Sequence, residues 1–125
     1  MNNILHLIVV TLIFISLDMV WFSQSADMYK ATILNIQKTP LNMRIGSGIF
    51  VWILLAAGLK MFVLEPNMST TNAFIKGAIF GLITYGVFNG TNHAIFENYD
   101  LKTSMYDTLW GGFVCGTSAV LATML

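Results

Sequence analysis

Four apolar runs of membrane length are the feature that most constrains the fold of this chain. They lie at residues 4–23, 43–64, 73–96 and 103–125. A helix of about 20 apolar residues crosses the hydrocarbon core of a bilayer, and it satisfies its own backbone hydrogen bonds there. The sequence therefore predicts an all-α polytopic membrane protein, with four transmembrane helices in a compact bundle that forms a single domain over residues 1–125.

Composition supports lipid as the solvent of this protein. Its 125 residues are 56% hydrophobic and 10% charged, whereas a soluble domain has about 25% charged residues. A small soluble protein could not bury so much apolar surface. Membrane lipids are therefore expected partners. Nucleic acid is not, because the net charge is zero and no basic run is present.

The first apolar run predicts a membrane span rather than a cleaved signal peptide. No Lys or Arg precedes it, and Asp18 interrupts it. The connection that follows predicts an amphipathic helix at about residues 25–38, lying in the membrane interface. Ser25 can cap this helix, Tyr29 and Ile33 share one face, and Pro40 follows its end.

The distribution of Lys and Arg predicts the orientation. With four spans, the first and third connections lie on one side and carry the larger share of the basic residues. That side has Lys30, Lys38, Arg44 and Lys102, against Lys60 and Lys76 on the other. Both termini are therefore expected to be extracytoplasmic or lumenal.

A polar stretch closes the third apolar run, and it is expensive to place in hydrocarbon without partners. It reads Tyr85-Gly-Val-Phe-Asn-Gly-Thr-Asn-His93. Asp18 lies about 8 Å from the inner end of its span, at 1.5 Å per residue. Asp107 lies at a similar distance from the inner end of the fourth span. The four spans therefore predict one polar layer near the inner leaflet.

An unpaired Asp in a span costs roughly 2.5–3.5 kcal/mol on insertion scales, so both acids need donors. Arg44, Asn89, Asn92 and His93 are the expected suppliers. The predicted intramembrane polar cluster comprises Asp18, Arg44, Asn89, Thr91, Asn92, His93 and Asp107, with Trp21, Tyr85 and Trp110 in supporting positions.

Small residues recur at intervals of four in the last two runs. The pairs are Gly77 with Gly81, Gly86 with Gly90, and Gly112 with Gly116. Such spacing lets helices approach closely, within one chain or between copies. A compact bundle and a homo-oligomer are both expected from it. Asn89-Gly90 is also a place where the third helix could unwind to line a site.

Several chemistries do not fit these residues. Cys115 is the only cysteine, and His6 and His93 fall at opposite membrane surfaces, so neither a zinc site nor a haem pair can be assembled. No phosphate-binding loop or Ser-His-Asp arrangement is present. No cofactor and no metal are expected. The abundance of Asn, Ile and Met is typical of an A+T-rich genome, a viral one among them.

Several short motifs resemble a family of small bacterial predicted membrane proteins catalogued as a domain of unknown function, number twenty-one seventy-seven. The motifs are Leu17-Asp-Met-Val-Trp-Phe22, Gly77-xxx-Gly81 with Tyr85, Thr91-Asn92, and Asp107-Thr-Leu-Trp-Gly111. Family members typically have Tyr-Asp-Leu-Thr-Asn where this chain has Phe88-Asn-Gly-Thr-Asn92, so Asn89 replaces an acid. The resemblance covers nearly the whole chain. It implies the four-span fold and no particular activity.

Three functions remain open from the sequence. The first is a small ion or proton pathway, or a solute carrier, in which Asp18 and Asp107 supply charge and His93 relays protons. The second is a membrane-embedded enzyme or accessory protein of lipid metabolism, with one of these acids as general base. The third is a membrane scaffold in which the polar cluster is only a structural latch.

Overall fold

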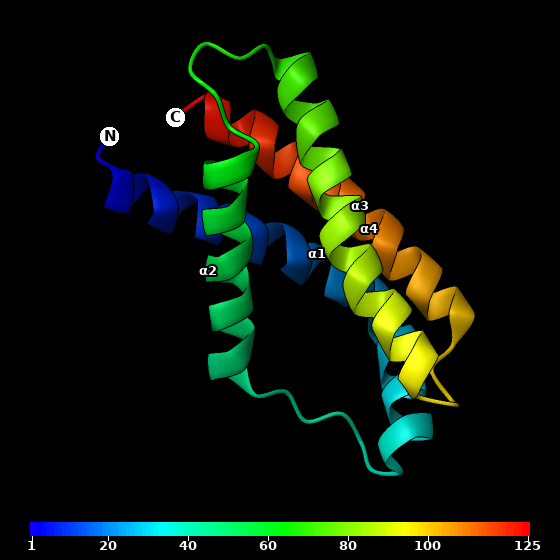
Figure 1. Cartoon of the computed structure of the whole chain (residues 1–125). Coiled ribbons are helices and arrows are strands. Elements are labelled where there is room, and N and C mark those ends of the chain that lie inside the picture. The colour runs from blue at the N-terminus through cyan, green and yellow to red at the C-terminus, as the bar shows by residue number, and fades with distance from the viewer.

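The structure, a computed structural model describing residues 1–125, is built from four α-helices (Figure 1). They are α1 (Asn3–Gln37), α2 (Ile45–Phe62), α3 (Thr70–Ile95) and α4 (Leu101–Thr123). α3 and α4 form a closely packed hairpin, α1 packs on α4, and α2 packs on α1. The all-α prediction is confirmed, and the ends of α2, α3 and α4 fall within three residues of the predicted apolar runs.

α1 is one helix of 35 residues, which corrects the prediction of a separate interfacial helix at residues 25–38. No Gly or Pro interrupts residues 3–37, so nothing breaks the helix before Lys38, which adopts the left-handed conformation with φ 62°. α1 changes direction along its length (Figure 1). Ser23 and Ser25 donate to the carbonyls of Val20 and Trp21, at 2.6 and 2.7 Å, and such bonds often bend helices.

The face predicted to lie in the interface packs against α4 instead. Tyr29 and Thr32 of α1 bond to residues of α4, and Asn98 in the α3–α4 turn donates to the Asn35 carbonyl at 3.2 Å. At 1.5 Å per residue α1 is about 52 Å long, well beyond a hydrocarbon core of about 30 Å. Part of α1 therefore extends past the core or the helix tilts strongly.

Three of the four helices, α1, α2 and α3, are long and apolar enough to cross a membrane. α4 is not among them, although its 23 residues suffice in length. The reason lies in its composition, since small and polar residues fill its inward faces. The buried residues of α4 are Thr103, Ser104, Asp107, Gly111, Gly112, Val114, Cys115, Gly116, Ser118, Ala119 and Ala122.

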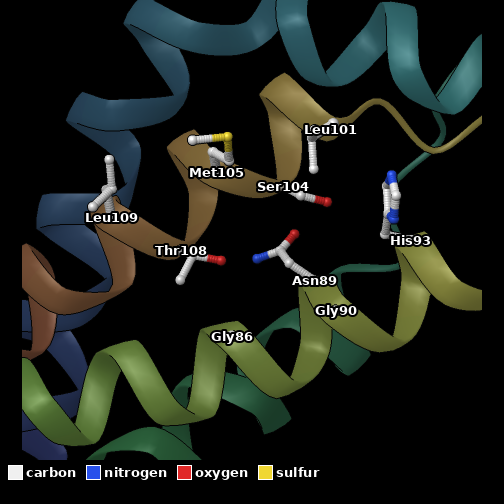
Figure 2. Close-up of a pocket in the computed structure, with 9 residues that line it drawn as sticks. All are labelled: Gly86, Asn89, Gly90, His93, Leu101, Ser104, Met105, Thr108 and Leu109. Atoms are coloured by element: carbon white, nitrogen blue, oxygen red, sulfur yellow. The ribbon is translucent and has the colours of Figure 1, made fainter.

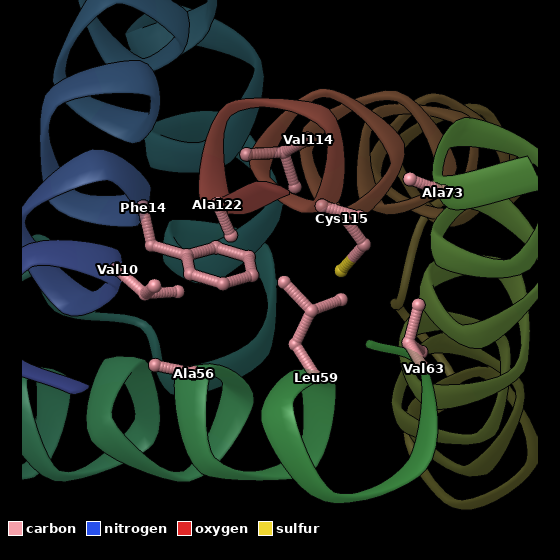
Figure 3. Packing of buried hydrophobic residues seen from close by; sticks show 10 residues of the cluster. Val10, Phe14, Ala56, Leu59, Val63, Ala73, Val114, Cys115 and Ala122 are labelled. Atoms are coloured by element: carbon pink, nitrogen blue, oxygen red, sulfur yellow. The ribbon is translucent and has the colours of Figure 1, made fainter. Parts of the chain in front are cut away.

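A hydrophobic core joins the four helices (Figure 3). It lies toward the end of the bundle that holds both termini (Figure 1). Val10 and Phe14 of α1 meet Leu59 of α2 and Val114 of α4 there, all fully buried. At the same end, His6 lies 2.9 Å from Lys60 Nζ and 3.3 Å from the Ala122 carbonyl. The N-terminus, the C-terminus and the α2–α3 turn therefore share one end of the bundle.

Close contact between α3 and α4 depends on glycine. A Cβ added to Gly77 would lie 2.6 Å from the Cys115 carbonyl oxygen, and one added to Gly81 would overlap the Gly111 carbonyl. Gly112 and Gly116 meet side chains of α3 in the same way. These glycines are therefore used within the chain and require no second copy. A Cβ at Gly90, in contrast, would meet nothing within 4 Å, and α3 remains helical there.

Candidate functional site

Asp18 is buried where α1, α2 and α4 meet, and both of its carboxylate oxygens accept a hydrogen bond. Trp52 of α2 donates from Nε1 to Oδ2 at 2.6 Å, and Trp110 of α4 donates from Nε1 to Oδ1 at 2.7 Å. An indole N–H only donates. Asp18 therefore ties three helices together through two donors that cannot reverse their role.

Asp107 is buried on α4, and its two oxygens are also occupied. The Tyr29 hydroxyl of α1 donates to Oδ1 at 2.5 Å, and Asn89 Nδ2 of α3 donates to Oδ2 at 2.6 Å. The second hydrogen of Asn89 Nδ2 goes to the Tyr85 carbonyl at 2.9 Å. A hydroxyl can donate or accept. Asp107 therefore differs from Asp18 in having one partner that can reverse its role.

Two further aromatic side chains, Trp21 and Tyr99, extend these two centres, and Trp21 joins them. Trp21 Nε1 donates to the Tyr29 hydroxyl at 2.7 Å, and the Tyr99 hydroxyl donates to Asn89 Oδ1 at 2.8 Å. The rings of Trp21 and Trp110 stack with centroids 4.9 Å apart. We call this set the aspartate network; its members are Asp18, Trp21, Tyr29, Trp52, Asn89, Tyr99, Asp107 and Trp110.

Helical periodicity brings these groups to one level. Asp18 and Trp21 lie three residues apart on α1, and Asp107 and Trp110 have the same spacing on α4, so each pair shares a face. The stacked indoles then set α1 against α4. Beyond the network, Thr32 Oγ1 and Thr103 Oγ1 lie 2.8 Å apart and continue the polar contact between these helices.

No cation takes part in the aspartate network. The single ion pair of the structure joins Lys76 to Glu65 at 2.6 Å, outside the network. Tyr99 lies in the α3–α4 turn, where burial raises the pKa of its phenol above the ordinary value. Its hydroxyl therefore keeps its proton and remains a donor to Asn89. The network consists of two carboxylates and neutral partners.

Other residues of the predicted cluster lie outside these hydrogen bonds. Arg44 is exposed just before α2 and its side chain bonds to neither acid. Thr91 and His93 are exposed on α3, and Asn92 is half-buried close to the Tyr99 hydroxyl. Of the four expected suppliers, only Asn89 donates to an acid. The lysines and arginine remain at the periphery because neutral indole, phenol and amide groups already satisfy the carboxylates.

Tyr85 contributes packing rather than a hydrogen bond to the acids. Its ring covers Gly111, where a Cβ would overlap the Tyr85 ring atoms. Trp52, Tyr29 and Tyr99 are the members that sequence reasoning missed. Trp52 is the one tryptophan of an otherwise apolar run, which was a usable signal. The sequence predicts an interfacial position for Tyr29, whereas the unbroken helix α1 places it against Asp107.

A groove of about 370 Å³ lies between α3 and α4, beside Asn89 (Figure 2). Its polar side chains come from both helices and its apolar side chains from α4. The lining residues are Gly86, Asn89, Gly90, His93, Leu101, Ser104, Met105, Thr108 and Leu109. Asn89 thus belongs both to the aspartate network and to the wall of the groove. No group of three or more His, Cys, Asp or Glu that could hold a metal ion occurs in the structure.

Comparisons with known proteins identify the family of the chain. No curated protein and no solved structure matches the chain. One family model matches residues 3–124, and it therefore covers all four helices and every member of the aspartate network. The chain belongs to the family described as "Predicted membrane protein (DUF2177)".

Proposed function

We propose that all four helices cross the membrane as one domain of residues 1–125. α4 is the helix that needs support, since its hydropathy alone does not identify it as a span. Several of its polar residues are buried in the bundle, and Thr103 and Asp107 among them bond to side chains of α1 and α3. Polar residues inside a membrane bundle face the bundle interior. The short α3–α4 turn also requires α4 to return alongside α3.

For the orientation, we propose that both termini are extracytoplasmic or lumenal. Lys30, Lys38, Arg44 and Lys102 belong to the end opposite the termini. At the terminal end, Lys60 is bonded to His6 and to the Asn3 carbonyl, and Lys76 is paired with Glu65. The larger number of basic residues at the end opposite the termini supports a cytoplasmic position for that end.

For the activity, we infer that the protein is a small proton or ion pathway, or a proton-linked solute carrier, with Asp107 as the group that exchanges a proton. The observation that carries this inference is that Asp107 has no cationic partner and bonds to the reversible hydroxyl of Tyr29. A proton can therefore arrive or leave without breaking an ion pair. Ionisable groups inside membrane segments commonly mark such pathways.

Proton flux into liposomes containing the purified protein and a pH-sensitive dye tests this inference. We expect flux above that of empty vesicles, and its loss in Asp107→Asn, which keeps the size of the side chain but cannot exchange the proton. Asp27→Asn is the matched control, because Asp27 is an exposed acid on α1. Flux equal to that of empty vesicles under both ionic and pH gradients would reject the pathway.

The hydrogen bonding of the network favours a second candidate function, a structural latch in a membrane scaffold. Each carboxylate oxygen of Asp18 and Asp107 accepts a hydrogen bond from a side chain of another helix, so the two acids tie all four helices together. This candidate predicts no flux and a clear loss of stability when a bond of the network is removed. The same bonds give no support to either acid as the general base of a lipid enzyme, because both acids are buried and every carboxylate oxygen is held by a side chain of a neighbouring helix.

A further inference from the structure

Ser104 carries a buried hydroxyl without a partner. Its side chain is on α4, the residue is 7% exposed, and Oγ makes no hydrogen bond. Most buried polar groups in proteins are paired, so an orphan of this kind requires an explanation. In Figure 2 the hydroxyl points from α4 into the groove, toward the side chains of α3.

The walls of the groove differ in polarity. Leu101, Met105 and Leu109 recur every fourth residue of α4 and form an apolar edge about 12 Å long, at 1.5 Å per residue. All three side chains are more than half exposed, so they face outward from the bundle, toward lipid. Gly86 and Gly90 of α3 leave the floor of the groove open, because a Cβ at Gly90 would meet nothing within 4 Å.

The depth of Ser104 in the membrane indicates which part of a lipid molecule can reach this groove. Ser104 lies three residues into α4, about 5 Å along the helix from its start near the membrane surface. Headgroup regions are about 5–8 Å thick on each side of the hydrocarbon core. Ser104 therefore falls at the boundary between headgroups and acyl chains, where the ester carbonyls of phospholipids lie and can accept a hydrogen bond from a hydroxyl.

We propose that the groove between α3 and α4 binds one membrane phospholipid, with an acyl-ester carbonyl accepting from Ser104 Oγ and the acyl chain lying along Leu101, Met105 and Leu109. Thr108, half-buried in the same groove, carries a second hydroxyl four residues further along α4. The inference rests on the proposed crossing of α4 and is independent of proton flux.

Photo-crosslinking in nanodiscs tests this site. The discs contain phosphatidylcholine and phosphatidylglycerol, with a small fraction of phospholipid that carries a diazirine in its acyl chain close to the ester. Mass spectrometry then locates the label. We expect labelling of residues 101–109 above that of the exposed apolar face of α2 around Phe50 and Leu54. Equal labelling of both surfaces would show annular lipid only and would overturn the proposal.

Two variant pairs separate binding from folding. Ser104→Ala should lower groove labelling by about fivefold, the value of one hydrogen bond. Ser118→Ala is the control, because Ser118 is the other buried unpaired hydroxyl, lies on the same helix and is outside the groove. Gly90→Leu should fill the groove and abolish labelling, whereas Gly46→Leu on α2, where a Cβ also meets nothing within 4 Å, should not. Undiminished labelling in Gly90→Leu contradicts the site.

Discussion

A Gly81→Val protein is expected to lose most of the stability of the α3–α4 hairpin. A Cβ at this position would overlap the Gly111 carbonyl oxygen and would lie 2.8 Å from Cys115 Cβ. The obstacle is backbone, so the helices themselves must separate. Overpacking costs about 1–3 kcal/mol and occasionally more, and we expect the upper end of that range. Thermal unfolding followed by circular dichroism in detergent measures the loss.

Gly90→Val provides the matched control for this experiment. It introduces the same side chain nine residues further along α3, where a Cβ meets nothing within 4 Å. Its intrinsic effect on helix propensity is the same. The Gly90→Val protein should therefore unfold at a clearly higher temperature than the Gly81→Val protein. If the two variants unfold at the same temperature, α3 and α4 are not in the close contact that the structure shows.

The second large effect is expected from Asp18→Asn. The change replaces one acceptor oxygen with an NH₂ group, which then faces the N–H of Trp52 or Trp110, and neither indole can accept. Leaving buried donors unpaired costs about 1–3 kcal/mol. Unfolding within a bilayer keeps residue 18 in lipid in both states, so the cost of placing it there largely cancels. Equilibrium unfolding in bicelles is the suitable measurement.

Asp107→Asn is the informative comparison, because the same chemical change meets a different partner. The new amide can donate to the Tyr29 hydroxyl, which also accepts from Trp21, while its oxygen still accepts from Asn89, so that only the Tyr29 proton loses its acceptor. The loss should stay below that of Asp18→Asn, because one donor is left without an acceptor here, whereas Asp18→Asn leaves two donors facing each other. A larger loss in Asp107→Asn than in Asp18→Asn would contradict the assignment of donors. Retained folding also makes this variant suitable for the flux assay.

The helices and the two acids could be predicted from the sequence because their signals are local. Apolar runs of span length placed α2, α3 and α4 to within three residues, and helix rise predicted a common depth for Asp18 and Asp107. The structure brings the two acids into one network through the stacked Trp21 and Trp110. The Gly77 and Gly81 pattern likewise indicated the close approach that is observed.

The identity of the donors could not be predicted, because it depends on how helices rotate against one another. Charge complementarity favoured Arg44 and His93 as partners of the acids, yet both remain exposed. The donors are Trp52, Trp110 and Tyr29, whose rings also fit a mostly apolar interior. The hydropathy of α4 was similarly ambiguous, since a helix shielded by others can carry small and polar residues that a lipid-facing helix cannot.

The indole N–H signals of the three tryptophans test the aspartate network most directly. In an NMR spectrum of the ¹⁵N-labelled protein in bicelles, we expect slow hydrogen exchange at the indole N–H groups of Trp52 and Trp110, and a change of both proton shifts in Asp18→Asn. The Trp21 signal should respond to removal of its acceptor in Tyr29→Phe. Fast exchange at Trp52 and Trp110, with shifts unaltered by Asp18→Asn, would contradict the network.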